Sequence, residues 1–487
     1  MLPQFLVRLM SDTVVPTLLE EPPRAAASPR PARLPLGHSL AFASLGIPTA
    51  IVALMMYTFM PRFYADHAGL ALSSVAAVFL IVRLIDIPFD LLVGLLIDRT
   101  RLKFGRYKSW MLVAIPFVMA SCWGLFMPPA RAGVGYLVFW LAVSNAGLSI
   151  FILSYASWTS SLAPHYAERS RLFGLVQGLG TLGSIGILLL PVLTHGRVTA
   201  GASSSMETIG WICIALLPVS ALLAAVFTPD RSVTQTAPRS MHLREIPSVI
   251  ARPTVLRLIA GDICLFLALS LTAPIQIFFL KDAKGFSIPE ISLLMIFFVA
   301  AGALGSPTWG RLGARIGKHR AIQFAGLFYA LCHLTLVFLP AVAAGHGPLQ
   351  MAPTAMALFA VGFCGSAFGI LIRAMVGDAA DEVLLEIGVD RTGLLYSMVS
   401  TTTKIGGALG VITFPLLAAF GYSASAKVVN TPAAIFDLKL IYCVLPLIFL
   451  LLGAIAFWGY TLDARRHAQI RQALESSGKG PPRNAVS

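Results

Sequence analysis

Three charged residues stand together in an otherwise apolar stretch, RLIDIPFD, at positions 83–90. Arg83, Asp86 and Asp90 are spaced i, i+3 and i+7, so in a helix they project from one face, within about 60° of one another. A charge at the centre of a bilayer costs at least about 2.5–3.5 kcal/mol, so this face must point into the protein or into an aqueous cavity. One arginine cannot neutralise two carboxylates. The pattern therefore predicts a site that shares protons or binds a cation.

Two more charges stand inside apolar stretches. Lys404, in STTTKIGGALG, is about ten residues into its stretch, and we expect it to pair with the two aspartates rather than to reach the membrane surface. Gly406 and Gly407 beside it allow another helix to approach closely. Asp262, in LIAGDICLF, has either a structural hydrogen-bonding role or a role in transport. The alternative for the whole cluster is a buried ion pair that holds helices together.

The composition places these charges in a membrane. Of the 487 residues, 57% are hydrophobic and 12% are charged, whereas soluble domains carry about 25% charged residues. An integral membrane protein is therefore expected. The formal net charge of +14 comes without a recognition motif, so we expect no nucleic-acid partner. No catalytic motif or metal-ligand spacing is present, which predicts no enzyme activity, no cofactor and no metal beyond a possible Na+ at the aspartates.

Twelve apolar spans are expected, each long enough to cross a bilayer as a helix. They are 38–60, 72–97, 109–127, 134–160, 172–194, 208–228, 255–280, 287–309, 321–342, 350–376, 394–419 and 438–460. Lys and Arg concentrate in two loops, with five in 98–108 and four in 311–320. Because cytoplasmic loops carry an excess of basic residues, both termini are expected to face the cytoplasm.

The two basic loops occupy the same place in each half of the chain, which is the parallel-repeat plan of a secondary transporter. We expect a disordered cytoplasmic tail at 1–36, an N-terminal six-helix bundle at 37–228 and a cytoplasmic link at 229–254. A C-terminal six-helix bundle at 255–460 and a cytoplasmic tail at 461–487 complete the predicted organisation.

A longer pattern surrounds the second span. Arg-x-x-Asp-x-x-x-Asp at 83–90 runs into Gly-x-x-x-Asp-Arg-Thr-Arg at 94–101 and then into Phe-Gly-Arg-x-Lys-x-Trp at 104–110. This combination resembles the glycoside–pentoside–hexuronide:cation symporters of the major facilitator superfamily, the melibiose permease-like transporters. The resemblance implies an all-α fold of 12 transmembrane helices in two bundles. It also implies that the two aspartates hold the coupling cation with Arg83 and Lys404 near them, and that the solute binds between the bundles and crosses by alternating access.

The solute-binding positions of that family are not kept. Its helix I aspartate corresponds to Ala50, and its helix IV aspartate and helix V arginine correspond to Ser154 and Leu179. Its helix IV threonine, which helps to hold Na+, has no counterpart near Phe151. The sequence thus favours H+ over Na+ as the coupling ion, and a sugar or sugar-like solute other than a galactoside. The side chains available to line a solute cavity are Tyr57, Asn145, Ser154, Tyr155, Trp158, Gln177 and Asp262.

Charged residues on the expected cytoplasmic face predict a gate. Ion pairs between the loop after helix II and the end of helix X would form this gate, closed when the cavity opens outward. The predicted members are Asp98, Arg99, Arg101 and Arg106 on one side and Asp378, Asp381 and Glu382 on the other. The alternative is that these residues belong to ordinary basic cytoplasmic loops.

Other functions are compatible with parts of the pattern. The same fold would suit a lipid-like or amphipathic solute, as in lysolipid transporters, or an exporter, because the sugar-binding acids are absent. A membrane enzyme or a receptor is disfavoured by the short loops and the lack of a catalytic motif. We therefore predict a cation-coupled symporter of a small-molecule solute, a monomer in the lipid bilayer of a bacterial inner membrane.

Overall fold

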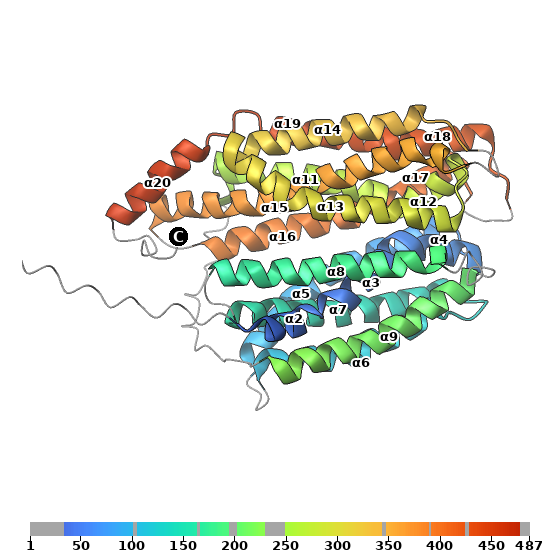
Figure 1. The fold of residues 1–487 in the computed structure, drawn as a ribbon, viewed down its shortest axis with the longest axis horizontal. Coiled ribbons are helices and arrows are strands. Elements are labelled where there is room, and N and C mark those ends of the chain that lie inside the picture. Colours follow the sequence, from blue (N-terminus) through green and yellow to red (C-terminus); the bar gives the residue numbers. More distant parts are fainter. Residues whose placement is uncertain are drawn as a thin grey trace, which may run out of the picture. The chain divides into compact units, whose positions relative to one another are not determined.

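The computed structural model of the chain describes residues 34–100, 105–162, 166–193, 202–228, 249–342, 347–388, 391–423 and 428–477. Met1–Leu36 and Gly37–Ser487 are separate units, and the helical bundle belongs to the second. Every regular element in the described ranges is helical (Figure 1), which confirms the predicted all-α class. Most of the predicted N-terminal tail and most of the predicted central link lie outside the described residues.

The helices of the first half follow the predicted spans. They are α2 (Leu36–Ala43), α3 (Gly46–Leu54), η1 (Met55–Phe59), α4 (Met60–His67), α5 (Leu72–Arg99), α6 (Arg106–Phe126), α7 (Val134–Leu162), α8 (Tyr166–Leu193) and α9 (Ala202–Phe227). The first four elements together make up one span.

The second half of the chain contains more helical elements than the first. Its helices are α11 (Pro253–Thr272), η4 (Ala273–Ile275), α12 (Gln276–Phe278), η5 (Phe279–Ala283), α13 (Ile288–Ile316), α14 (Lys318–Phe338), α15 (Pro348–Ile387), α16 (Thr392–Leu409), η6 (Gly410–Ile412), α17 (Thr413–Ala419), α18 (Pro432–Cys443), α19 (Leu445–Ala456) and α20 (Ala464–Ser476).

Membrane-crossing helices account for most of the described chain. Eleven of them are long and apolar enough to span a bilayer within the described residues, so this is an integral, multi-pass membrane protein. The remaining predicted span, 72–97, is α5, a continuous helix of 28 residues that carries Arg83, Asp86 and Asp90. The count of twelve spans and the side on which the termini lie stay predictions.

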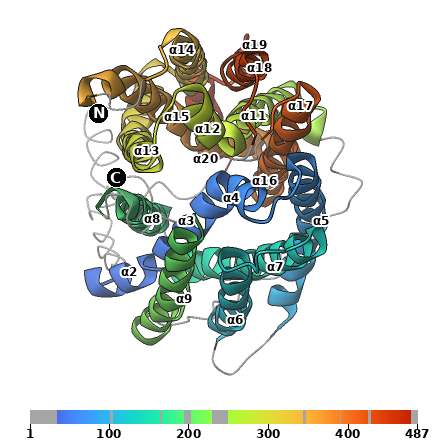
Figure 2. The ribbon, with the colours of Figure 1, turned by 90° about the vertical axis from the view of Figure 1, so that its right-hand side faces the viewer.

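Several pairs of helical elements bring the halves together, among them η1 with η4 and α5 with η6. α8 packs against α13, and α5 packs against both α16 and α17. Figure 2 shows α5, α6, α7 and α9 on one side and α11, α14, α15 and α19 on the other, with α4 between them. Below, the end of the bundle where α4 finishes is called the α4 end, and the opposite end, where α20 lies, is called the α20 end (Figure 1).

A π-helical turn interrupts the first span of each half. In the first half it is η1, and in the second half it is η5. Single π-turns inside α-helices frequently mark functional sites. Here η1 contains Tyr57, which contacts Arg83 of α5, and η5 contains Asp282.

The predicted tail at 461–487 contains a packed helix. α20 lies against α15, and its Ile470 and Leu474 are buried. A helix with an apolar side and a polar side is expected to cover a core in this way. This part of the tail therefore belongs to the folded second half.

Candidate functional site

The two sides of α5 differ in what they face. The side chains of Asp86 and Asp90 are 5% and 20% exposed, whereas Leu84 and Ile85 are 51% and 61% exposed. The apolar side chains cover the lipid-facing side, and the aspartates face the neighbouring helices of the bundle. The i, i+4 spacing of the aspartates places both on the same side, because a helix turns once every 3.6 residues.

Lys404 of α16 reaches this site from the other half of the chain. Its Nζ pairs with Oδ2 of Asp90 and lies 3.5 Å from Oδ2 of Asp86. The structure thus brings together three of the four residues predicted for the cation site. One ammonium group shared by two carboxylates leaves this group of three with a net negative charge.

A serine completes the coordination of Asp86. Ser149 of α7 donates its hydroxyl hydrogen bond to Oδ1 of Asp86 at 2.8 Å. The sequence did not predict Ser149 as a partner of Asp86, although it lies two positions from Phe151 on the same helix. Its hydroxyl supplies an oxygen atom beside Asp86, and the choice between H+ and Na+ stays a prediction.

Asp90 retains an unused oxygen. Its Oδ1 is buried and has no hydrogen-bond partner among the described residues. Carboxylate and hydroxyl oxygens suit hard cations and protons alike. No group of three His, Cys, Asp or Glu side chains in the described ranges is placed to hold a metal, so a bound Na+ would need the serine hydroxyl, backbone oxygens or water as further ligands.

Arg83, the fourth predicted member, faces a cavity beside the aspartates. Its guanidinium lies over the ring of Tyr57, 4.4 Å from the centroid. No carboxylate within the described residues comes within ion-pair distance of it. Arg83 and Tyr57 line a cavity of about 240 Å³ between the halves, whose remaining wall is apolar except for Ser270. Arg83 therefore presents a cation to this cavity rather than to the aspartates.

Glycines allow α16 and η6 to lie close to both neighbouring helices. A Cβ at Gly407 would lie 3.6 Å from Nη2 of Arg83. A Cβ at Gly406 would lie 3.2 Å from the backbone of α11, and one at Gly410 would lie 2.3 Å from the carbonyl oxygen of Ser270. The predicted close approach is confirmed for Gly406, and Gly410 is a position that sequence reasoning missed.

Three of the side chains predicted to line a solute cavity have other surroundings. Asn145 donates to the carbonyl of Leu141 on its own helix at 2.8 Å. Trp158 is fully buried with its ring edge-on to Phe42, at a centroid distance of 5.2 Å. Gln177 is exposed.

The other predicted lining residues are also dispersed. Ser154 is fully buried, and its hydroxyl has no partner among the described residues. Tyr155 is half-buried and packs beside Phe151. Asp262 is fully buried inside the second half. Of the predicted set, Tyr57 is the one on the cavity between the halves.

Two of the acids predicted for the gate have partners within the second half. Both carboxylate oxygens of Asp378 lie 2.7 Å from Nζ of Lys318, the first residue of α14. Asp381 lies 2.9 Å from Nε2 of His467 on α20. These contacts attach α14 and α20 to the end of α15.

The third acid predicted for the gate, Glu382, also has its partner within the second half. Glu382 accepts a hydrogen bond from Thr254, at the start of α11, at 2.6 Å. Its predicted partners cannot be placed beside it: Arg101 and the side chains of Asp98, Arg99 and Arg106 lie outside what the structure describes. Pairing across the halves at this end stays a prediction.

A second ionic cluster joins the halves at the α4 end. Nη1 and Nη2 of Arg62 lie 3.0 and 3.2 Å from Oδ2 and Oδ1 of Asp282, and Nε lies 3.2 Å from Asp66. Tyr422 donates its hydroxyl to Asp282 as well. The guanidinium also lies 4.8 Å from the ring centroid of Phe278. A bidentate arginine–carboxylate pair has a defined geometry as well as opposite charges, so it holds α4 against η5.

Sequence reasoning missed this cluster because its members stand at the ends of spans, where charges are common. A usable signal was present: an acid and a base follow the first span of each half, in PRFYAD and in LKDAK. Burial raises the pKa of Tyr422, and the nearby Asp282 carboxylate raises it further, so the phenol stays protonated and acts as a donor.

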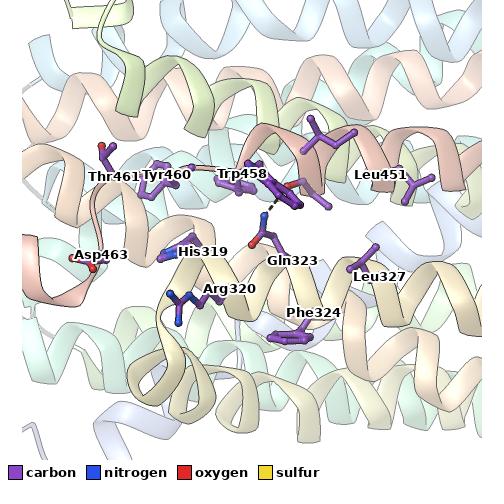
Figure 3. Close-up of a pocket in the computed structure, with 14 residues that line it drawn as sticks. His319, Arg320, Gln323, Phe324, Leu327, Leu451, Trp458, Tyr460, Thr461 and Asp463 are labelled. Carbon is purple, nitrogen blue, oxygen red and sulfur yellow. Dashed lines mark hydrogen bonds between the residues drawn. The ribbon is translucent and has the colours of Figure 1, made fainter.

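Figure 3 shows a larger cavity, of about 860 Å³, and none of the residues that line it belongs to either cluster. It is formed by residues 319–327 of α14 and by residues 451–463, all in the second half. Gln323 donates to the carbonyl of Ala454 across it at 2.9 Å. Because neither wall comes from the first half, this cavity does not suit a solute that passes between the halves.

These features define a class of protein: a bundle of membrane-crossing helices in two halves that are joined by ionic clusters. The chain matches the family model described as MFS/sugar transport protein over residues 41–464, and it belongs to that family. It is therefore a transporter and not an enzyme.

Relatives with recorded names carry different solutes. The chain is 25% identical to the isoprimeverose transporter of Lactiplantibacillus pentosus, over 84% of this chain and 85% of the relative. It is 23% identical to the glucuronide carrier protein homolog of Escherichia coli (strain K12), over 91% and 95%. It is 24% identical to the sodium-dependent lysophosphatidylcholine symporter 1 of Xenopus tropicalis, over 91% and 90%.

Solved structures share the fold at lower identity. The nucleoside transporter NupG superposes with a TM-score of 0.62 at 14% identity, covering 88% of this chain and 99% of that chain. A bacterial homolog of the human lysosomal transporter Spinster, in an inward-facing, unoccupied conformation, superposes with a TM-score of 0.61 at 12% identity, covering 89% and 97%. At these identities the likeness concerns the fold alone.

Proposed function

We propose that this protein is a secondary active symporter that moves a sugar or sugar-like solute together with a cation by alternating access. The observation that carries this proposal is the cluster of Asp86, Asp90 and Lys404. It lies in the membrane, bridges the two halves and leaves Oδ1 of Asp90 without a described partner. An intramembrane acid of this kind supports an ion pathway.

The cluster offers a physical route to coupling. Two carboxylates share one ammonium, so a bound cation would neutralise the remaining charge in a low-dielectric site. Because Lys404 belongs to the second half and the aspartates to the first, cation binding would change how strongly the halves attract one another at this point. A cation can shift the equilibrium between two conformations only through such a difference in interaction.

The coupling ion is H+ or Na+. A proton would bind Asp90 directly, with Lys404 released to Asp86. The hydroxyl of Ser149 on Asp86 supports Na+, because it adds a neutral oxygen ligand. Coupling to H+ and coupling to Na+ lead to different expected effects on the stability of the same protein.

Thermal unfolding of the purified protein in detergent separates these ions. We would measure the melting temperature against pH, with Na+, Li+ or K+, for the wild type and for Asp86→Asn and Asp90→Asn. A Na+ effect abolished by both substitutions would establish Na+; a pH effect flattened by both, without a Na+ effect, would establish H+. Asp437→Asn, an aspartate in α18 without a described ion pair, serves as the matched control. If neither ion acts through the aspartates, the symport proposal fails.

The solute site is proposed to be the cavity beside the cluster. Its wall offers few hydrogen-bonding groups, namely Tyr57, Arg83 and Ser270. Arg83 has no described carboxylate partner, so it suits a solute with an anionic group such as a uronate. An arginine is well suited to carboxylate or phosphate oxygens because its guanidinium presents a fork of donors.

A second candidate solute follows from the same wall. Pro61, Phe79 and Phe414 make much of it apolar, which favours an amphipathic molecule with an anionic headgroup, such as a lysophospholipid. Stabilisation of the detergent-purified protein by a neutral glycoside, a glucuronide and a lysophospholipid would compare these solutes. Binding of the glucuronide or lysolipid that Arg83→Gln weakens, while the neutral glycoside has no effect, would support an anionic solute.

Location and assembly belong to the same proposal. We propose a monomer in the bacterial inner membrane with the α20 end in the cytoplasm. Light scattering of the detergent complex would test the monomer. Labelling of single cysteines introduced at the two ends of the bundle, in intact cells, would test the orientation.

A further inference from the structure

Asp262 is an intramembrane acid outside the cation cluster. It lies on α11 and is fully buried. Its Oδ2 accepts hydrogen bonds from the hydroxyl of Thr402 and, at 3.3 Å, from that of Thr403, both on α16. Its Oδ1 is buried and has no hydrogen-bond partner among the described residues. A charged carboxylate in such surroundings is unfavourable unless a cation lies beside it.

No cation pairs with Asp262 in the part of the chain that the structure describes. Arg373 of α15 acts on it electrostatically, but it is exposed and forms no ion pair with Asp262. Lys404 pairs with the aspartates of α5 instead. α19, which packs against α11, carries no ionisable side chain. A negative charge on Asp262 would therefore lack a direct counter-charge.

The threonines can form hydrogen bonds without donating to Asp262. The hydroxyls of Thr402 and Thr403 each lie 2.9 Å from the carbonyl oxygen of Val399. A hydroxyl has one proton, so one that donates to this carbonyl presents only its oxygen to Asp262. A protonated Asp262 can then donate to that oxygen. The arrangement accommodates the neutral acid with every proton used.

We propose that Asp262 is a proton-binding site, separate from the aspartates of α5, and that its proton is exchanged during the transport cycle. Thr402, Thr403 and Lys404 are consecutive residues of α16, so a single helix contacts both sites. Deprotonation of Asp262 would change the hydrogen bonds that hold α16 to α11, and with them the position of Lys404. The role in the cycle rests on the proposed transport function, but proton binding itself does not.

Infrared spectroscopy of the full-length protein in detergent tests this without a solute, because a protonated carboxyl absorbs apart from a carboxylate. At neutral pH we expect a protonated-carboxyl band that Asp262→Asn removes and Asp90→Asn retains. As the pH rises, the band of the wild type should disappear and its melting temperature should fall over the same range, since the ionised form is buried without a counter-charge. Asp262→Asn keeps the shape of the neutral acid and should show neither change.

Thr402→Val provides an independent variant should Asp262→Asn fold poorly. It removes a hydroxyl that can donate to the carboxylate, so the band should persist to higher pH than in the wild type. A wild type without such a band, or a band whose intensity and pH dependence are the same in Asp262→Asn as in the wild type, would overturn the proposal. Cation-dependent stabilisation that persists in Asp90→Asn would contradict the proposed function alone and would leave this result intact.

Discussion

Two ionic clusters join the halves of this transporter, and each consists of one basic side chain and two aspartates. Each leaves one buried carboxylate oxygen without a described partner, Oδ1 of Asp66 at the α4 end and Oδ1 of Asp90 on α5. The clusters differ in the aspartate that makes the contact between the halves, because Asp66 pairs with Arg62 on its own helix whereas Asp90 pairs with Lys404 of the other half.

At the α4 end, both oxygens of Asp282 are engaged by the guanidinium of Arg62, and the hydroxyl of Tyr422 adds a further bond. In the middle of α5, Asp90 shares Lys404 and leaves one oxygen without a described partner. The first arrangement is suited to holding the halves together, and the second to receiving a cation.

The two clusters therefore suit different roles: the one at the α4 end closes the halves against each other, and the one on α5 couples their movement to a cation. A satisfied buried ion pair mainly costs free energy when it is broken, so it can act as a latch between conformations. An unsatisfied one changes its energy when a cation arrives. The clusters can be tested against each other, because both offer aspartates that accept the same substitution.

Replacing Arg62 should have the largest effect. Arg62→Ala leaves Asp282 without its cation, and breaking a buried pair in this way costs about 3–5 kcal/mol. We expect the α4 end to open, so that the distance between spin labels at the exposed positions Ala71 and Val429 increases. Arg315→Ala, an exposed arginine of α13, is the control. An unchanged label distance would show that the cluster at the α4 end is not a latch.

Exchanging aspartate for asparagine in each cluster should sharpen the contrast. Asp90→Asn is expected to lose the stabilisation by the coupling cation, which amounts to about 2.7 kcal/mol at a concentration 100-fold above Kd. Asp282→Asn should keep that stabilisation although its baseline stability falls. Melting temperatures measured across a cation titration would check both variants. Equal loss in the two variants would contradict the assignment of coupling to the cluster on α5.

Removing one hydroxyl from the latch should produce a smaller change. Tyr422→Phe deletes a hydrogen bond to a charged acceptor, worth about 1.5 kcal/mol. The spin-label distances at the α4 end should show a second, longer population, smaller than in Arg62→Ala. Tyr136→Phe, whose hydroxyl bonds to a carbonyl within the first half, provides the matched control. A larger effect for Tyr422→Phe than for Arg62→Ala would reverse the proposed order.

The smallest expected change concerns the support of Asp86. Ser149→Ala removes the hydroxyl that donates to this carboxylate, and loss of such a supporting contact weakens metal binding by about tenfold. If Na+ is the coupling ion, its apparent affinity in the melting assay should fall by this factor, while Ser144→Ala on the same helix should leave it unchanged. Identical Na+ titrations of the wild type and Ser149→Ala would place the hydroxyl outside the site.

The cation cluster could be predicted in part because its strongest signal is local. The spacing of Arg83, Asp86 and Asp90 depends only on helical geometry, and their unfavourable transfer into lipid depends only on residue type. Lys404 was a reasonable partner because few other charges lie inside the spans. Ser149 was missed because a serine inside a membrane helix usually bonds to its own backbone, and only packing shows that this one points at Asp86.

The surroundings of other side chains could not be predicted from neighbouring residues alone. Asn145, Trp158 and Gln177 carry groups suited to a solute, but their direction depends on how each helix is rotated within the bundle. Arg62 and Asp282 were missed for the converse reason, since charges at span ends are common and their pairing requires contact between segments 220 residues apart.

The sequence by itself determined the membrane environment, the helical class and the charged face of α5, because hydrophobic content and helical periodicity are properties of neighbouring residues. Only the tertiary structure decided which carboxylates are paired and which oxygens remain open. In the tertiary structure Lys404 contacts Asp86, 318 residues away in the sequence. Arg83 lines a cavity, and Asp262 is buried. Those outcomes depend on the packing of helices from both halves, since an ion pair forms only where the fold brings its two charges within a few ångströms.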